Sequence, residues 1–321
     1  MDGVSYSESL TEQHLIPERP KAPRSGIHAA LWIPTSQDGV LKRESLARHL
    51  DWLKGQGIHG ILALGSTGEF ARMDLLQRET ILAAVIELAS PLPVMANISS
   101  IRLDEVIHLG KAAARLGACG VAIMPPSFFP LSQSDILEFF LRAANHVPLP
   151  FYLYNYPEVT GNRIGVDVIS QFADRAPMAG IKQSGLELDY HRDLISLGKR
   201  KGYSVFTAAD PELVTYLEMG AVGCIGGLVN FAPELMIDVY DAHLRKTPFD
   251  AAQSSSRLRE IGHLCSQLML PLNVRSGMEA RGFDPGDLKS VFSSQTLEVY
   301  QRVVRQFSEA FRAWGLPCIR A

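Results

Sequence analysis

A short apolar run ends at a lysine in the segment Met178-Ala179-Gly180-Ile181-Lys182-Gln183-Ser184-Gly185. Short runs that are nearly continuous in apolar residues are typical of strands covered on both faces, and the polar residues after the lysine indicate a loop. Seven similar runs occur elsewhere in the chain, so this segment is one unit of a repeating pattern. The eight runs span residues 27–33, 60–64, 93–98, 120–124, 150–154, 178–181, 203–207 and 221–225.

Amphipathic segments with helical periodicity separate the runs. They span residues 41–56, 74–89, 103–116, 134–144, 166–173, 188–197 and 211–218. Asp74 is expected to cap the second segment, and Gly117 and Gly198 are expected to end the third and the sixth. Eight strand–helix repeats predict an α/β fold that closes into a (β/α)8 TIM barrel. A doubly wound open sheet is disfavoured, because it normally has fewer repeats and a glycine-rich turn after its first strand.

Beyond Phe231 the pattern changes to helices alone. Residues 233–245 are predicted to form the last barrel helix, followed by helices over 250–270 and 295–314 with a loop at about 275–285 between them. The polar, proline-containing N-terminus is predicted to be an extended arm. The expected organisation is therefore an arm over residues 1–25, a barrel over 26–246 and a C-terminal helical extension over 247–321.

The composition favours a compact enzyme over a protein that binds nucleic acid or a membrane. The 321 residues are 46% hydrophobic and 20% charged, with a net charge of −3, and no lysine- or arginine-rich run occurs. The four cysteines lie far apart without a CxxC pair, which favours reduced thiols and a cytoplasmic location. The nine histidines have no metal-site spacing, so no metal is expected.

Barrels of this type place their active sites at the carboxyl ends of the strands. Lys182 is the only lysine at such a position, and a lysine among apolar neighbours can offer a nucleophilic amine. Gly65-Ser66-Thr67-Gly68-Glu69 follows the second strand, and its glycines, hydroxyls and free N–H groups suit a carboxylate. Tyr154 ends the fifth strand, where its phenol suits proton transfer. Each feature has a structural alternative. The Lys182 ammonium could extend to solvent or pair with Glu69, the glycine-containing loop could be only a tight turn, and Tyr154 could be an aromatic residue of the core or the barrel rim.

Three motifs each follow their own strand: Gly-Ser-Thr-Gly-Glu, Tyr154-Asn155-Tyr156-Pro157 and Gly180-Ile181-Lys182. Together they resemble the dihydrodipicolinate synthase/N-acetylneuraminate lyase family. The resemblance covers residues from about Gly26 to Asn230 and implies a (β/α)8 barrel with a C-terminal helical extension. It implies that Lys182 forms an imine with a 2-keto acid such as pyruvate, and that Tyr154 transfers protons. It further implies that Ser66 and Thr67 hold the carboxylate, with Ser66 relaying a proton to Tyr154, and that no cofactor is needed.

Two departures from the family pattern narrow the substrate. Dihydrodipicolinate synthases carry an arginine five positions after the tyrosine, where this chain has Val159, so lysine biosynthesis is disfavoured. Arg163 lies nearby, but the turn would have to be rebuilt for it to substitute. Many members also insert a tyrosine from the adjacent subunit, and the matching residue here is Phe128, which has no hydroxyl. The motif Tyr-Asn-Tyr-Pro-x-x-Thr-Gly is closer to that of the 2-keto-3-deoxy sugar acid aldolases. The motifs Lys182-Gln183-Ser184 and Gly65-Ser66-Thr67-Gly68-Glu69 are closer to those of sialic acid lyases.

Four positions are candidates for contact with substrate or with the imine. Thr160 is a candidate for reading substrate hydroxyls. Asp210 is expected either to do the same or to cap a helix that begins at Pro211. Gly226, after the eighth strand, is expected to pack its backbone closely beside the imine. Phe128 is expected to supply an aromatic wall from a neighbouring subunit.

The sequence therefore predicts a Schiff-base aldolase, a carbon–carbon lyase that handles pyruvate and an aldehyde. The predicted substrate is a 2-keto-3-deoxy sugar acid or a related 4-hydroxy-2-keto acid, and the predicted assembly is a homo-oligomer, a tetramer or a dimer. Two alternatives use the same lysine imine, namely a dihydrodipicolinate synthase-type condensation and a hydratase-aldolase or dehydratase. The alternative of another class is a barrel without catalysis that senses 2-keto acids.

Overall fold

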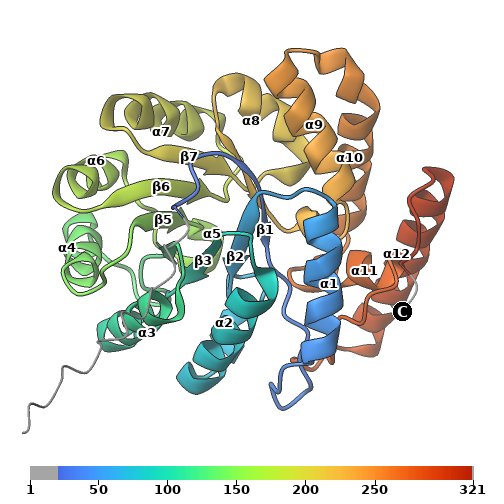
Figure 1. The fold of residues 1–321 in the computed structure, drawn as a ribbon, viewed down its shortest axis with the longest axis horizontal. Coiled ribbons are helices and arrows are strands. Elements are labelled where there is room, and N and C mark those ends of the chain that lie inside the picture. The colour runs from blue at the N-terminus through green and yellow to red at the C-terminus, as the bar shows by residue number, and fades with distance from the viewer. Residues whose placement is uncertain (1–20, 320–321) are drawn as a thin grey trace, which may run out of the picture.

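The chain folds into a closed barrel of eight parallel strands surrounded by helices, as the computed structural model shows for residues 21–319 (Figure 1). Neighbouring strands follow the order of the sequence, and β1 pairs with β8 to close the sheet. The predicted (β/α)8 fold is thus confirmed and the open sheet is wrong. The strands are β1 (Gly26–Ala30), β2 (Gly60–Ala63), β3 (Val94–Asn97), β4 (Gly120–Ile123), β5 (Phe151–Asn155), β6 (Met178–Gln183), β7 (Ser204–Thr207) and β8 (Gly223–Gly226).

Helices fill the connections between the strands. Those of the barrel are α1 (Arg43–Gly55), α2 (Leu75–Ala89), α3 (Leu103–Leu116), α4 (Gln133–Ala144), α5 (Pro157–Thr160), α6 (Val166–Arg175), α7 (Leu188–Lys201), α8 (Leu213–Met219) and α9 (Pro233–Arg245). Short 3-10 turns are η1 (Phe70–Arg72), η2 (Asp210–Glu212), η3 (Leu228–Asn230) and η4 (Pro248–Ala251). None of the helices within residues 21–319 combines the length and hydropathy that crossing a bilayer requires.

Local sequence signals explain several helix boundaries. The Asp74 carboxylate accepts the Gln77 N–H while the Gln77 side chain bonds back to Asp74, which forms a capping box at the start of α2. Gly117 ends α3 with a positive φ of 97°, which glycine adopts without strain. Both boundaries confirm the sequence prediction.

Two helix predictions were wrong. α7 does not end at Gly198 but continues to Lys201 and ends at Gly202, because Gly198 packs its bare Cα against Tyr203 inside the helix–strand contact. The residues from 275 onward were expected to be a loop, yet residues Leu272–Ala280 form the helix α11. That helix packs against α12, and Gly277 lets it approach the ring of Phe231 closely. Such packing leaves no signal in local periodicity.

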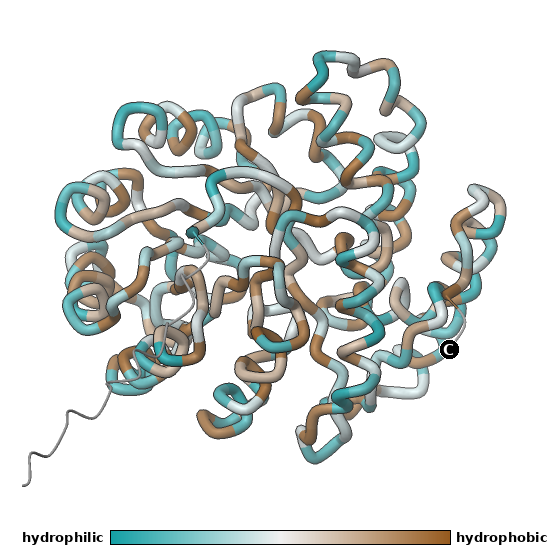
Figure 2. Tube along the Cα trace, in the orientation of Figure 1, coloured by the Kyte–Doolittle hydropathy of each residue, from teal (hydrophilic) through white to brown (hydrophobic). Residues whose placement is uncertain are grey.

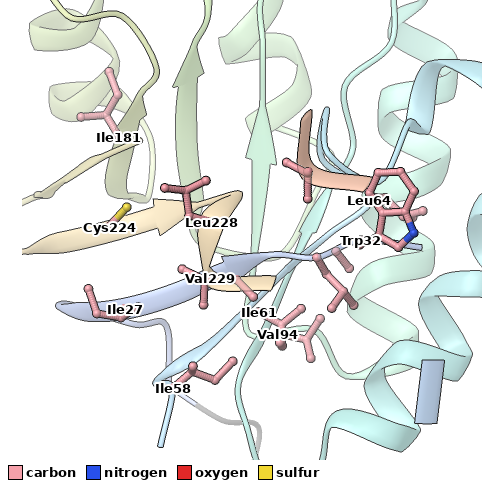
Figure 3. Close-up of a cluster of buried hydrophobic side chains, with 14 of the residues drawn as sticks. Ile27, Trp32, Ile58, Ile61, Leu64, Val94, Ile181, Cys224, Leu228 and Val229 are labelled. Carbon is pink, nitrogen blue, oxygen red and sulfur yellow. The ribbon is translucent and has the colours of Figure 1, made fainter. Parts of the chain in front are cut away.

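The core lies in two places. The outer layer fills the space between the strands and the helices, and Figure 3 shows part of it around Ile27, Ile61 and Val94. A smaller cluster fills the barrel interior with Ala30, Leu62, Met95, Cys119, Ala122, Tyr152, Ala179, Phe206 and Ile225. Figure 2 shows hydrophilic residues gathered on the outward sides of peripheral helices such as α6 and α7. Because strand residues alternate between the two layers, the position of a residue decides whether its side chain faces the interior.

The residues that precede β1 close the amino-terminal end of the barrel. Tyr152 donates its hydroxyl to the Pro23 carbonyl at 2.5 Å, and Ser204 donates to the Arg24 carbonyl at 2.8 Å. This end is therefore packed shut, which leaves the carboxyl end for a site. The predicted arm over residues 1–25 lies mostly outside the described residues, since the structure describes only its last five positions.

After α9, the chain is helical apart from short turns and an irregular segment near residue 285. The helices are α10 (Ala252–Cys265), α11 (Leu272–Ala280) and α12 (Ser294–Ala313), and α11 and α12 pack together beside α1 (Figure 1). A C-terminal helical extension is confirmed. The division of the chain at residues 25 and 246 remains a prediction.

Candidate active site

The pairing of β5 with β6 places two of the predicted residues side by side. Tyr154 lies opposite Lys182 in the register, two residues beyond the pair Tyr152 and Gly180. A side chain at position 180 would lie within 2.9 Å of the Tyr152 ring, so glycine leaves room for that ring in the barrel interior. The two-residue period then brings Tyr154 and Lys182 to the same interior face, one layer nearer the carboxyl end.

Lys182 is buried, with 4% of its surface exposed. Its Nζ lies 3.2 Å from the Tyr154 hydroxyl oxygen and 4.2 Å from the centre of that ring. The alternatives proposed for this lysine are wrong: it does not extend to solvent, and Glu69 pairs instead with Lys289 and Arg72. The amine therefore faces a phenol rather than a carboxylate, which leaves it available to react.

Tyr154 is linked to both the lysine and the serine loop. Its hydroxyl lies 3.3 Å from the Ser66 hydroxyl. Burial alone would raise the pKa of Tyr154, but the charge of Lys182 and hydrogen bonds with Ser66, Ser184 and Lys182 outweigh it and lower the pKa below the ordinary 10.0. A phenol whose ionised form is stabilised in this way is suited to accept and return a proton.

The loop between Gly65 and Glu69 forms a compact turn. Gly68 donates its N–H to the Gly65 carbonyl and Glu69 donates to the Ser66 carbonyl, at 3.1 and 3.0 Å. Within residues 21–319, the N–H groups of Ser66 and Thr67 make no hydrogen bond, so two donors remain unused beside Lys182. Adjacent unused N–H groups in a turn are a favourable place for an anion such as a carboxylate.

The two glycines of this loop, Gly65 and Gly68, lie outside the lining of the site, and close packing explains only Gly68. A side chain at Gly68 would lie 3.0 Å from the Leu31 carbonyl and 3.1 Å from Ile33. Gly65 meets only ordinary contacts with Leu62. Neither glycine lines a cavity of the site, so their prediction as substrate-binding residues is not supported by their position.

Two connected cavities open around these residues. The inner cavity, about 210 Å³, is lined by Ser66, Thr67, Tyr154, Lys182 and Ser184, together with residues of α10 and α11. The second cavity, about 650 Å³, which we call the outer cavity, is lined by Glu69, Met124, Val159 and Thr160 among others. Ser66, Tyr156 and Leu270 line both cavities. The geometry thus offers a small chamber at the amine and a larger chamber beside it for the remainder of a substrate.

The position of Asp210 corrects the sequence prediction. Its carboxylate does not cap the helix that follows, because it accepts the Leu228 N–H at 2.7 Å and the Cys224 thiol at 3.3 Å. Gly226 is required here, since a side chain would lie 2.4 Å from the carboxylate oxygens. Burial raises the pKa of Asp210, and the Leu228 N–H and the Cys224 thiol oppose the rise. Asp210 lines the inner cavity, but these contacts already occupy both its oxygens.

The other two predicted substrate contacts, Thr160 and Phe128, are less favourably placed to touch a substrate. Thr160 lines the outer cavity, but its hydroxyl bonds to the backbone carbonyls of Tyr156 and Asn162. Phe128 is 85% exposed and lines neither cavity of its own chain. Val159, at the position of the family arginine, lines the outer cavity, whereas Arg163 is bound to Glu187 at 2.5 Å. Arg163 therefore does not replace the missing arginine.

Sequence reasoning assigned no role to Tyr156, although the residue stood inside the quoted motif. Its ring stacks on Tyr154 at 6.1 Å and forms part of the wall between the two cavities. The sequence signal that could have identified Tyr156 is its spacing of two residues from Tyr154, which puts both rings on one side of the chain.

Residues 21–319 contain no group of three or more histidine, cysteine, aspartate or glutamate side chains placed to hold a metal ion.

Comparison with known proteins agrees with this geometry. The model of the dihydrodipicolinate synthetase family matches residues 23–310. An uncharacterized DapA-like lyase from Thermococcus onnurineus is 31% identical over 80% of this chain and 89% of its own length. A probable 2-dehydro-3-deoxy-D-pentonate aldolase from Escherichia coli is 27% identical over 74% of this chain and 80% of its own length.

Solved structures share the fold. YagE from Escherichia coli, described as a prophage protein in complex with pyruvate, superposes with a TM-score of 0.84 at 24% identity, covering 92% of this chain and all of YagE. The 2-keto-3-deoxygluconate aldolase from Picrophilus torridus gives 0.78 at 22% identity, covering 84% and 97%. The barrel, the buried lysine and these relatives define an enzyme of the lyase and aldolase class. The chain belongs to the dihydrodipicolinate synthetase family.

Proposed function

We propose that this enzyme is a Schiff-base aldolase that cleaves or forms the bond between a pyruvate unit and an aldehyde. The observation that carries the proposal is the contact of the buried Lys182 amine with the Tyr154 hydroxyl, 3.2 Å apart, beside the Ser66 hydroxyl. In the proposed reaction the substrate is a 2-keto-3-deoxy sugar acid or a related 4-hydroxy-2-keto acid. The pyruvate unit occupies the inner cavity and the remainder occupies the outer one.

The proposed reaction begins when the neutral Lys182 amine attacks the C2 carbonyl. Loss of water gives a protonated imine, while the unused N–H groups of Ser66 and Thr67 hold the substrate carboxylate. Tyr154, as the phenolate, removes the proton of the C4 hydroxyl, the C3–C4 bond breaks, and the electron pair moves into the imine to give an enamine. Protonation at C3 and hydrolysis then release pyruvate and restore the amine. The imine is the electron sink, and the proposal requires no cofactor.

The identity of the aldehyde is narrowed by the outer cavity. Its volume of about 650 Å³ exceeds that of the inner one, and Val159 stands where dihydrodipicolinate synthases carry an arginine. Val159 offers no charge for a second carboxylate, which weighs against a dihydrodipicolinate synthase-type condensation. The named aldolases among the relatives are consistent with a hydroxylated aldehyde.

We also propose that the enzyme works as a homo-oligomer. Phe128 and Phe129 are exposed next to the outer cavity, with their rings in edge contact at 4.9 Å. Covering them with a second copy would remove apolar surface from water. Light scattering on the purified protein tests this point, and a monomer at the concentrations used in assays would contradict it. The cytoplasmic location stays a prediction, consistent with the four free cysteines.

Trapping with borohydride tests the central proposal. The protein is mixed with pyruvate, reduced, digested and analysed by mass spectrometry, and the expected product is a stable adduct on Lys182. Lys182→Ala should abolish the adduct, while Lys111→Ala, which removes an exposed lysine on α3, should leave it intact. An adduct that survives Lys182→Ala would refute the imine mechanism.

The substrate class is tested separately with a panel of 2-keto acids and detection of released pyruvate. Cleavage of a 2-keto-3-deoxy sugar acid supports the aldolase assignment. Water loss without pyruvate release would instead identify a dehydratase that uses the same imine. A trapped imine without turnover of any panel member would favour a 2-keto acid sensor.

A further inference from the structure

An ion pair buried beside the candidate active site joins two distant parts of the chain. Lys289 Nζ lies 2.7 Å from a Glu69 oxygen, and the two side chains are 5% and 7% exposed. Glu69 ends the turn that contains Ser66 and Thr67, whereas Lys289 belongs to the C-terminal extension. Neither side chain takes part in the reaction proposed above.

Lys289 reaches Glu69 from a short segment that we call the strap, residues Asp284–Lys289. The strap crosses the segment that follows β1: Trp32 donates its ring N–H to the Pro285 carbonyl, and Asp287 donates its N–H to the Thr35 carbonyl. Gly286 has a φ of 80°, and a side chain there would lie 2.5 Å from the Thr35 carbonyl. Only a glycine allows so close a crossing.

The strap is also held from its other side. Arg275, on α11, donates to the Gly286 carbonyl at 2.7 Å. Lys289 itself donates a second hydrogen bond to the Ile33 carbonyl at 3.1 Å and lies 5.4 Å from the centre of the Trp32 ring. The lysine is thus fixed by three separate contacts, so its ammonium has a defined position rather than a flexible one.

Glu69 in turn determines the shape of the serine–threonine turn. It has a φ of 57°, an uncommon conformation for a residue other than glycine, and donates its N–H to the Ser66 carbonyl. Its carboxylate pairs with Lys289 through one oxygen and with Arg72 through the other, at 2.7 and 3.1 Å. The left-handed backbone persists because these contacts over-determine it.

We infer that Lys289 is a positioning residue, which holds the Ser66–Thr67 turn in the geometry that binds the substrate carboxylate. The two unused N–H groups must converge on one anion, and a turn released from its ion pair would aim them less accurately. The C-terminal strap therefore acts on carboxylate binding through Glu69, without touching the substrate. This inference rests on the proposed function.

The test measures the pyruvate concentration that gives half-maximal borohydride trapping, together with kcat and KM for cleavage. In Lys289→Met this concentration should rise at least about tenfold, equivalent to about 1.4 kcal/mol of binding free energy. The kcat should change less, because Lys182 and Tyr154 keep their contact. Lys289→Arg should restore most of the affinity, since it keeps the charge.

Lys42→Met is the matched control. Lys42 binds the same strap through Asp284 and Asp287, but its side chain is 34% exposed and lies away from Glu69. It should leave the half-saturating pyruvate concentration unchanged. If Lys289→Met lowers the melting temperature but leaves pyruvate affinity at the wild-type value, or if Lys42→Met has the same effect on affinity, the inference is wrong.

A double variant covers the case in which Lys289→Met does not fold. Lys289→Met leaves the buried Glu69 carboxylate with only the more exposed Arg72 as a partner, whereas Glu69→Gln with Lys289→Met removes both charges of the buried pair. The double variant should fold and still bind pyruvate weakly, and wild-type affinity would overturn the inference. A wild-type enzyme that traps no pyruvate would instead refute the proposed function, so the two failures are distinguishable.

Discussion

At the scale of single residues, the chemistry depends on how Lys182 and Tyr154 influence one another. The lysine charge is the largest of the contributions that lower the pKa of the Tyr154 phenol, which burial would otherwise raise. A protonated imine keeps a positive charge at the same place, so the tyrosine would remain stabilised as a phenolate after the lysine has reacted. The pair therefore works as one unit, and a change in either partner should be visible in the other.

Replacing the lysine should change the titration of the tyrosine. Lys182→Met removes the positive charge but leaves Tyr154 buried, so the pKa of Tyr154 should rise above its ordinary value. Ultraviolet difference titration of phenolate formation measures this change in pKa. One tyrosine should ionise at a lower pH in the wild type than in the variant. The difference should vanish in a Tyr154→Phe background, and a difference that persists there would assign the shift to another tyrosine.

Removing the phenol should separate imine formation from bond cleavage. Tyr154→Phe keeps the ring and the packing against Tyr156 but removes the proton acceptor, so kcat should fall by about 10²- to 10⁴-fold. Borohydride trapping of pyruvate on Lys182 should survive at least in part. Tyr300→Phe, on α12, is the control, because it also removes a buried tyrosine hydroxyl, one that bonds to Glu279 and lines neither cavity. Unchanged turnover in Tyr154→Phe would remove the tyrosine from the mechanism.

At the scale of secondary-structure elements, short strands and capped helices bring the site residues to one end of the barrel. β5 and β6 place Tyr154 opposite Lys182, and α2 follows the turn that holds Ser66 and Thr67. Helix periodicity predicted α9 to the residue and α2 to within one residue. It failed at Gly198, where a glycine inside α7 serves a packing contact rather than a helix end.

The capping box of α2 gives a prediction for stability. Asp74→Ala removes the acceptor of the Gln77 N–H, so the free energy of unfolding should fall by about 1 kcal/mol. Urea unfolding followed by circular dichroism measures the change. Asp193→Ala, at an exposed position within α7, is the control and should cost nothing measurable. Equal effects of the two substitutions would show that the capping box contributes nothing of its own.

At the scale of the whole molecule, buried histidines couple stability to pH. Burial lowers the pKa of His28, on β1, and of His49, on α1, from 6.5 to about 4. Both are fully enclosed, and each donates a hydrogen bond to a backbone carbonyl. They stay neutral in the folded chain down to low pH, whereas the unfolded chain takes up a proton on each below about 6.5.

Stability should therefore be lost as the pH falls from 6.5 through about 4, because unfolding gains protons over this range. Each histidine should account for roughly 3 kcal/mol of the loss. Urea unfolding at a series of pH values measures it, and His49→Gln should weaken the pH dependence in this window. His146→Gln replaces an exposed histidine as the control. If both variants show the same pH dependence as the wild type, buried His49 is not a source of acid instability.

The fold and the candidate site residues could be predicted from the sequence, because the strand and helix signals are local and three motifs resemble those of a known family. Strands have a period of two and helices a period of 3.6, and eight repeats of the pair indicate a barrel whose strand ends gather Ser66, Tyr154 and Lys182. A residue that ends a strand is brought to the site by the topology alone. The sequence also indicated, through Val159, that an arginine expected in dihydrodipicolinate synthases is missing.

The tertiary structure alone decided what each side chain contacts. It bound Asp210 to Leu228 and Cys224 rather than to its own helix. It placed the first part of the loop expected at about 275–285 in the helix Leu272–Ala280. It also brought Lys289 to Glu69, 220 positions away in the chain. These contacts depend on how distant faces pack against each other, and no local periodicity encodes that. The sequence by itself therefore determined the barrel and the position of Lys182 on one of its strands, while packing decided how the surrounding turn is held.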